Sequence, residues 1–261
     1  NFFNIETIGV TRFLNFFVIL LNKILLLFLA LRITNLTNLK SSERVLYYFL
    51  LSITLLSFTS YQSPIFFLRS FLLLFFILLI LNLVVLKGKN FINLSLIGFL
   101  SSMSMFWYID IGIYINCIIL LLLSLFLVKK ETQSFLILFI SIIAGWFIFY
   151  FTIPYDEFSQ FLKNTKLIIS TIDYIHGLIF PTPFISQDAR SSKALLIFLI
   201  TGFLIITAIN KPRKYNLKFL LIMTILFIIS ILYFKYSLSR SDGGHLRVGV
   251  GFLYIPFFSL L

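Results

Sequence analysis

Apolar residues occur along this chain in long uninterrupted runs, and the stretch from Phe71 to Leu86 is typical, with Asn82 as its one polar member. Strands of a transmembrane barrel alternate apolar and polar residues over about ten positions, and these runs do not. They predict membrane-crossing helices, because a helix needs about 20 apolar residues to span the hydrocarbon core and satisfies its own backbone. We expect eight spans and part of a ninth, near residues 12–32, 45–60, 66–86, 91–108, 111–128, 134–153, 193–210, 218–236 and 247–261.

Composition points the same way. Hydrophobic residues make up 60% of the 261 positions and charged residues 11%, with a mean hydropathy of +1.07. A soluble domain has about 45–50% apolar and about 25% charged residues, and a disordered chain has few aromatics, whereas this one has 34 Phe. The predicted fold class is therefore all-α: one integral-membrane helical bundle over residues 1–261, without internal repeats or linkers between soluble domains.

The two ends of the sequence look like cut ends. Residue 1 is Asn, and no basic segment or cleavage site of a signal peptide precedes the first apolar run. The last apolar run, from Val248 to Leu261, has only 14 residues, fewer than the roughly 20 that a span needs. We expect the chain to be an internal piece of a longer protein.

The loops between the expected spans alternate in charge, which predicts the orientation. One set contains eleven basic and two acidic residues (Arg32, Lys40, Arg44, Lys87, Lys89, Lys129, Lys130, Lys211, Arg213, Lys214 and Lys218; Glu43 and Glu131). The other set contains nine basic and seven acidic residues (Arg12, Arg69, Lys163, Lys166, Arg190, Lys193, Lys235, Arg240 and Arg247; Glu6, Asp110, Asp156, Glu157, Asp173, Asp188 and Asp242). The positive-inside rule assigns the first set to the cytoplasm. The net charge of +12 then reflects membrane topology and not nucleic-acid binding.

The chemistry is expected on the outer face, where both histidines and seven of the nine acids fall. The long outer loop, residues 154–192, begins with an amphipathic pattern from Tyr155 to Ser170 that predicts a helix lying in the membrane interface, either as a cap or as a substrate gate. Asp173 and His176 follow. A carboxylate and an imidazole three residues apart can share one helix face or meet across a turn closed by Gly177. The pair could carry out acid–base chemistry, but two groups are too few to predict a metal site. The stiff segment Pro181–Phe184 comes next, and then the basic residues Arg190 and Lys193.

A second polar constellation runs from Arg240 to Arg247, between two apolar spans. It combines two arginines with Asp242, His245 and the Gly243–Gly244 pair within eight residues. Guanidinium groups bind phosphate through paired hydrogen bonds, and glycines let the backbone approach a ligand closely. The segment is a candidate phosphate site, with Asp242 and His245 as candidate catalytic groups.

A third constellation spans Trp107 to Asn116 around a very short outer turn. Asp110 would lie at the membrane interface, where a carboxylate is a candidate functional group, and it could pair with Arg69 as a binding site or as a structural ion pair. Trp107, Tyr108 and Tyr114 fit an aromatic belt.

The first span is unusually polar, with Arg12, Asn15, Asn22 and Lys23 along it. These side chains could face a cavity, or Lys23 could be buried against a partner. Cys117, the one cysteine, fits a small buried apolar residue and forms no internal disulfide. No cofactor is predicted; a divalent metal has no motif to support it.

The turn from Arg240 to His245, the segment from Trp107 to Asn116 and the long outer loop together resemble bacterial polytopic membrane glycosyltransferases of the GT-C type. The resemblance implies a bundle that takes a sugar from a polyprenyl-phosphate donor on the periplasmic side of the inner membrane, for the synthesis of cell-envelope polysaccharide. That superfamily carries its catalytic acid in the first outer loop. Here that loop would lie upstream of Asn1 or end near Glu6, so no residue is matched to the catalytic base.

Residue chemistry agrees with this expectation. Lipid-linked phosphate needs an apolar groove, cations at headgroup depth and a carboxylate to activate the acceptor hydroxyl of a glycan or lipid. Three alternatives stay open. A polysaccharide polymerase or ligase would show the same arginine-rich outer loops. A transporter or flippase would carry polar residues on broken helices near the midplane, and often repeats; a structural membrane subunit would use its outer loops for docking.

Overall fold

The computed structural model describes residues 8–60, 64–85, 91–175, 184–185, 189–211, 215–238 and 251–261, and within these ranges every regular element is helical. For residues 8–11, 57–60, 64–70, 85, 172–175, 189–190 and 235–238 it describes the backbone alone. The helices are α1 (Ile8–Thr34), α2 (Ser41–Ser60), α3 (Pro64–Val85), α4 (Phe91–Trp107), α5 (Ile109–Val128), α6 (Thr132–Thr152), α7 (Tyr155–Ile175), α8 (Ala189–Ile209), α9 (Leu217–Leu238), the 3₁₀ turn η1 (Gly251–Leu253) and α11 (Tyr254–Leu260).

The predicted all-helical class is confirmed for these ranges, and each of the eight complete apolar runs is a helix whose ends lie within four residues of the expected ones. Five helical segments are long and apolar enough to cross a membrane: Arg12–Thr34, Ile109–Val128, Thr132–Thr152, Ser191–Ile209 and Leu217–Phe234. The apolar segments Phe71–Val84, Phe91–Trp107 and Gly251–Leu260 are shorter. The chain is therefore built as an integral membrane protein whose apolar helices suit contact with a lipid bilayer.

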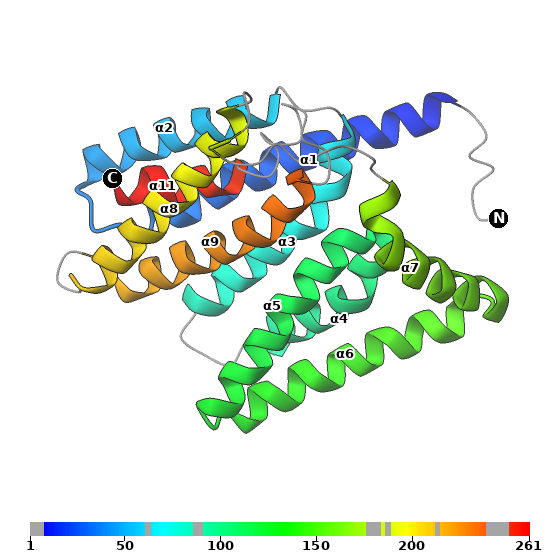
Figure 1. Cartoon of the computed structure of the whole chain (residues 1–261). Coiled ribbons are helices and arrows are strands. Elements are labelled where there is room, and N and C mark those ends of the chain that lie inside the picture. The colour runs from blue at the N-terminus through cyan, green and yellow to red at the C-terminus, as the bar shows by residue number, and fades with distance from the viewer. Residues whose placement is uncertain are drawn as a thin grey trace.

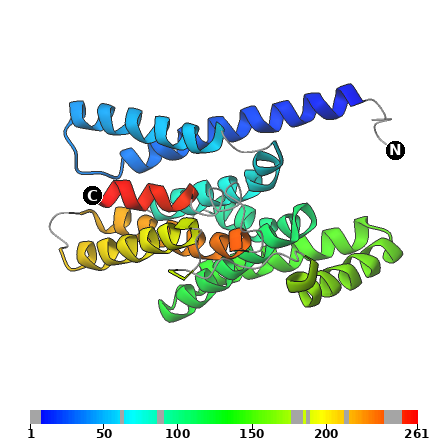
Figure 2. The same cartoon turned by 45° about the horizontal axis from the view of Figure 1, so that its top comes forward.

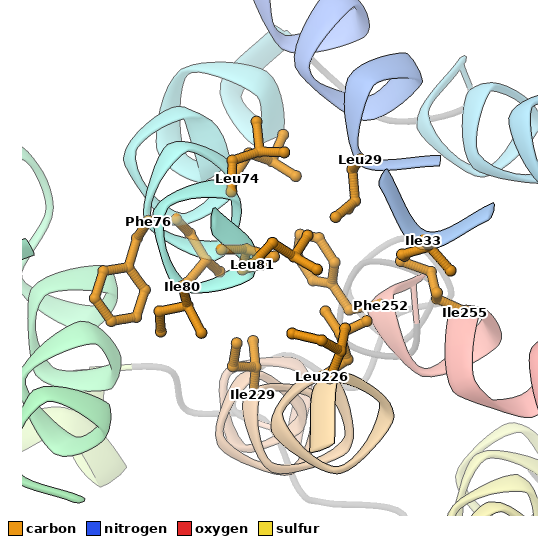
Figure 3. Packing of buried hydrophobic residues seen from close by; sticks show 14 of the residues in the cluster. Leu29, Ile33, Leu74, Phe76, Ile80, Leu81, Leu226, Ile229, Phe252 and Ile255 are labelled. Atoms are coloured by element: carbon orange, nitrogen blue, oxygen red, sulfur yellow. The ribbon is translucent and has the colours of Figure 1, made fainter. Parts of the chain in front are cut away.

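The core surrounds α3. Its residues from Leu72 to Leu81 are buried almost without exception, because α1, α4, α5 and α9 all pack against it. A helix that is apolar on every side is expected at the centre of a bundle. Figure 3 shows α1, α9, η1 and α11 converging on α3 through Leu29, Ile33, Leu74, Phe76, Ile80, Leu81, Leu226, Ile229, Phe252 and Ile255.

Successive helices reverse direction, so their ends gather at two opposite ends of the bundle (Figures 1 and 2). At one end, which we call the basic end, α1 is joined to α2, α5 to α6 and α8 to α9. Contacts there include a hydrogen bond from Tyr47 of α2 to Ser259 and one from Tyr215 to the Leu260 carbonyl. At the opposite end, the acidic end, Tyr233 of α9 packs edge-on against both Tyr114 and Phe252.

Among the described helices, α4 and α6 make the most extensive contact, and they run parallel. Each carries two small residues four positions apart, and these pairs interlock: Gly98 lies against Ser141, and Gly145 lies against Ser102. A methyl group added at Gly98 would lie 2.5 Å from the Ser141 Cβ, and one at Gly145 would lie 2.7 Å from the Ser102 Oγ. Small residues at this spacing are the usual means by which membrane helices bring their backbones together.

A tight turn at the basic end joins α5 to α6. Glu131 N–H donates to the Phe126 carbonyl at 2.9 Å, and Lys130 N–H donates to the Leu127 carbonyl at 3.0 Å. This is the Schellman pattern that closes many helices, and Lys130 occupies its left-handed position with φ of 56°. Lys129 and Lys130 thus lie beside the negative end of the α5 dipole, where cations are favoured.

Helices α1 and α2 form a separate layer on one side of the bundle, and Figure 2 shows the first half of α1 extending past its neighbours. The second half of α1 is buried at Leu26, Leu29, Ala30 and Ile33, whereas the first half is exposed at Phe13 and its neighbours.

Candidate functional site

Five of the ten predicted site residues lie on described helices. Asp110 is in the first turn of α5, Arg69 in the first half of α3, Asp173 near the end of α7, and Arg190 and Lys193 in the first turns of α8. Lys193 is exposed and Asp110 half-buried. The other five, His176, Arg240, Asp242, His245 and Arg247, fall outside the described residues, as does the segment Pro181–Pro183.

The five residues on described helices all belong to the acidic end of the bundle, because of the direction in which their helices run. α5 and α8 start there, since Tyr114 near the start of α5 meets Tyr233 near the end of α9, and Phe198 of α8 packs against Phe234 of the same helix. The structure therefore brings the helix positions to one end of the molecule. It describes the side chains of Asp110 and Lys193 alone among them, so a shared binding cavity stays a prediction.

Asp110 is held by a very short turn, as the sequence predicted. Tyr108 alone separates α4 from α5, in an extended conformation with φ of −152° and ψ of 122°. Gly112 permits this reversal: a Cβ there would lie 2.6 Å from the Met105 Cα. The carboxylate consequently lies at the positive end of the α5 dipole, where an anion is stabilised. α3 packs against α5, and the pairing of Asp110 with Arg69 stays a prediction.

Helix α7 lies across the acidic end, and an aromatic cluster attaches it to the bundle (Figure 1). The ring of Phe106 at the end of α4 stacks on Phe149 of α6 at 4.6 Å and on Phe161 of α7 at 4.3 Å, with Phe158 at 6.1 Å. Thr165 is also buried. Leu162, Ile168 and Ile169, which belong to its apolar side, are exposed. This arrangement fits the predicted amphipathic helix at the membrane interface.

Two expectations in this region need correction. The helix predicted from Tyr155 to Ser170 continues to Ile175, so Asp173 lies on this helix. α8 begins at Ala189, which makes Arg190 part of a helix and shortens the loop predicted over residues 154–192. The reason is shared: Ser, Thr and Lys at these ends fit a helix as readily as a loop when apolar neighbours continue the helical spacing.

Tyr114 is a further correction, because it does not belong to an aromatic belt. Its side chain is 8% exposed and packs on Tyr233 at a ring distance of 5.8 Å. It lies on the side of α5 that packs against α9, so the bundle covers it. Trp107, at the helix end, is 39% exposed and keeps the position expected of a belt residue.

The sequence reasoning missed a polar network between α4, α5 and α6. Asn116 Nδ2 donates to the carbonyls of Ser101 at 2.9 Å and Gly112 at 2.8 Å, while the Ser101 hydroxyl donates to Asn116 Oδ1. Trp146 Nε1 in turn donates to Ser101 Oγ at 3.3 Å. Every member is satisfied by another, which is how buried polar groups are accommodated in a membrane bundle. The four serines and the glycine on α4 were the sequence feature that could have predicted this network.

Asn22 and Lys23 lie on different sides of α1. Asn22 is fully buried against the bundle, whereas Lys23 is exposed. A single cavity facing all the polar residues of the first span, as considered above, would therefore not include both Asn22 and Lys23.

Among the described residues, no group of three or more His, Cys, Asp or Glu side chains could hold a metal ion. Comparisons of the chain with protein families, with curated proteins and with solved structures find no match.

Proposed function

We propose that this chain is the membrane bundle of a glycosyltransferase-like enzyme that transfers a sugar from a polyprenyl-phosphate donor on the outer face of a bacterial inner membrane. The acceptor is a glycan or lipid of the cell envelope. The resemblance of the outer segments to GT-C glycosyltransferases motivates the proposal.

The observation that supports it most is the separation of charge between the two bundle ends. Lys129 and Lys130 occupy a tight turn at the basic end, whereas Asp110, Asp173 and Lys193 belong to the opposite end. Carboxylates and cations at the same end suit a reaction in which a carboxylate activates a hydroxyl and a cation binds phosphate.

The proposal includes a complete topology. We propose that α2, α3 and α4 cross the membrane in addition to the five long apolar helices, and that η1 with α11 belongs to a ninth span. In this arrangement α7 lies in the periplasmic interface with its exposed apolar side toward the acyl chains, where it could border the path of a polyprenyl tail.

Phosphate binding would use the start of α8. Arg190 and Lys193 are three residues apart in its first turns, so they belong to neighbouring positions on one helix side. The helix N-terminus adds a favourable field for an anion. Asp173 on α7, or Asp242 with His245 in the segment before η1, would supply the base, with Arg240 and Arg247 as further cations.

A binding measurement with a short polyprenyl phosphate tests this assignment. The full chain in proteoliposomes should bind farnesyl phosphate, and the double variant Arg190→Ala/Lys193→Ala should bind it about tenfold more weakly, since charge-assisted hydrogen bonds are lost. The matched control, Lys129→Ala/Lys130→Ala, removes two cations from the basic end and should leave the affinity unchanged. Equal weakening by both pairs would refute a specific phosphate site.

Sugar transfer in cells separates the proposed enzyme from its alternatives. Arg240→Ala and Asp242→Ala should each abolish glycan transfer without lowering the amount of protein in the membrane. If the protein were a polymerase or ligase, the inactive variants would instead accumulate short lipid-linked units. If it were a flippase, the donor would remain on the cytoplasmic leaflet in these variants. Unchanged product in both variants would count against the proposal.

A further inference from the structure

Lys23 lies at the midpoint of the α1 span. It follows Arg12 by 11 residues and precedes Arg32 by 9, which places it about 16 Å and about 14 Å along the helix from the two arginines. The hydrocarbon core is about 30 Å thick, so both interfaces are far from Lys23. The four-carbon stem of lysine is much shorter than either distance, and snorkelling therefore leaves the ammonium group short of the headgroups.

The bundle does not cover this charge. The Lys23 side chain is exposed, and the half of α1 that precedes it extends past the neighbouring helices (Figure 2). Phe16 and Leu20, which precede Lys23 by seven and three residues, share its side of the helix and are 63% and 45% exposed. Ionisable groups inside a membrane normally face a bundle interior or an aqueous cavity and pair with another group.

We propose that the surface formed by Phe16, Leu20 and Lys23 binds a transmembrane helix of a partner protein, and that this helix carries an Asp or Glu at the bilayer midplane. Charge complementarity selects the occupant: a carboxylate at the same depth would neutralise the ammonium group, and apolar side chains on either side would pack on Phe16 and Leu20. This inference does not depend on the proposed sugar chemistry.

A second copy of this chain does not meet the requirement. The sequence has nine acidic residues, and each lies in a loop or near a helix end, none at the middle of an expected span. The most deeply placed is Asp110, in the first turn of α5. Two copies docked through the same surface would instead bring two Lys23 side chains together, which like-charge repulsion opposes.

A synthetic helix provides the test. The full chain would be reconstituted in liposomes with an apolar Leu-Ala peptide of about 20 residues that carries a single Glu at its midpoint, and a photo-cross-linking residue would replace Leu20. The matched peptide carries Gln at the same position. Capture of the Glu peptide should exceed that of the Gln peptide about five- to thirtyfold, the range of strong interhelical polar pairs in membranes.

Two variants of the chain make the result specific. Lys23→Leu should reduce capture of the Glu peptide to the level of the Gln peptide, and its unfolding in detergent should match that of the parent chain. A cross-linker at Phe28, which is 48% exposed on a different side of α1, should capture both peptides weakly and equally.

Three outcomes would overturn the proposal. They are equal capture of the two peptides at position 20, capture that persists in Lys23→Leu, and products that contain only lipid or only a second copy of the chain. The lipid outcome would mean that Lys23 faces the acyl chains, and the second-copy outcome would mean that the chain self-associates through this surface.

Discussion

Replacing Gly98 by Ala tests whether the close approach of α4 and α6 holds this part of the bundle together. The added Cβ would meet the Ser141 Cβ at 2.5 Å and two backbone atoms of α6, Ile142 N and Leu138 O, at 3.0 Å. Backbone atoms cannot rotate away as a side-chain end can, so the two helices must separate.

Two opposing effects determine the magnitude. Ala is favoured over Gly inside a helix by about 1 kcal/mol, whereas overpacking a tight contact costs about 1–3 kcal/mol. We expect Gly98→Ala to lower the free energy of unfolding by up to about 2 kcal/mol, the difference between these two effects. Gly202→Ala on α8 is the matched control, because its nearest neighbour is the Phe227 Cζ at 3.3 Å, the edge of a ring that can shift. That variant should be as stable as the parent chain or up to about 1 kcal/mol more stable.

A double-mutant cycle identifies the contact. Ser141→Gly removes the nearest Cβ and should partly restore Gly98→Ala, with a coupling energy of about 1 kcal/mol. Ser141→Ala keeps that Cβ and should show no coupling. Reversible unfolding in mixed micelles would be followed by the fluorescence of Trp146, which reaches α4 through its hydrogen bond to Ser101. The reasoning is refuted if Gly98→Ala is as stable as Gly202→Ala, or if Ser141→Gly and Ser141→Ala behave alike.

Three other predictions follow from single features of the fold. Asn116→Leu removes the donor and acceptor of the network and should cost about 0.6–1.7 kcal/mol in the same unfolding assay, the range for interhelical hydrogen bonds in membranes; no change would mean that the network contributes nothing to stability. Lys130→Gly should raise stability by about 0.5–1 kcal/mol, since φ of 56° is unstrained for glycine, and a loss would contradict the assigned turn. In a Cys117→Ala background, a cysteine at Gln160 should react with an impermeant thiol reagent from outside and one at Lys130 from inside only; the reverse pattern would invert the topology.

Most of the fold could be predicted from the sequence because every segment that crosses a lipid bilayer as a helix must be long and apolar. Long apolar runs in the sequence locate α1 to α6, α8 and α9, but they do not show which helix lies at the centre of the bundle and which at its periphery. Apolar residues dominate both α3 and α1, yet almost every residue from Leu72 to Leu81 of α3 is buried, whereas Phe13 in α1 is 66% exposed. In a bilayer, apolar side chains suit both environments, so hydropathy carries no information about which helix is central.

Small and polar residues carry the information that hydropathy lacks. Gly98 with Ser102, and Ser141 with Gly145, mark the sides on which α4 and α6 meet, and Ser101 with Asn116 marks the contact with α5. An isolated serine or glycine means little, but a pair four residues apart in each of two spans predicts a tight crossing.

The candidate site follows a different logic. Charge alternation predicts the end of the bundle at which Asp110, Asp173 and Lys193 lie, because each helix carries its charges to one end or the other. It cannot predict which side chains meet, since that depends on helix rotation and on the path of the outer segments. Tyr114 illustrates this limit. It packs on Tyr233 on the bundle side of α5, although a tyrosine at that distance from the turn would suit the membrane interface equally well. Rotation about the helix axis, and not depth in the membrane, determines its environment, and the same variable separates the buried Asn22 from the exposed Lys23.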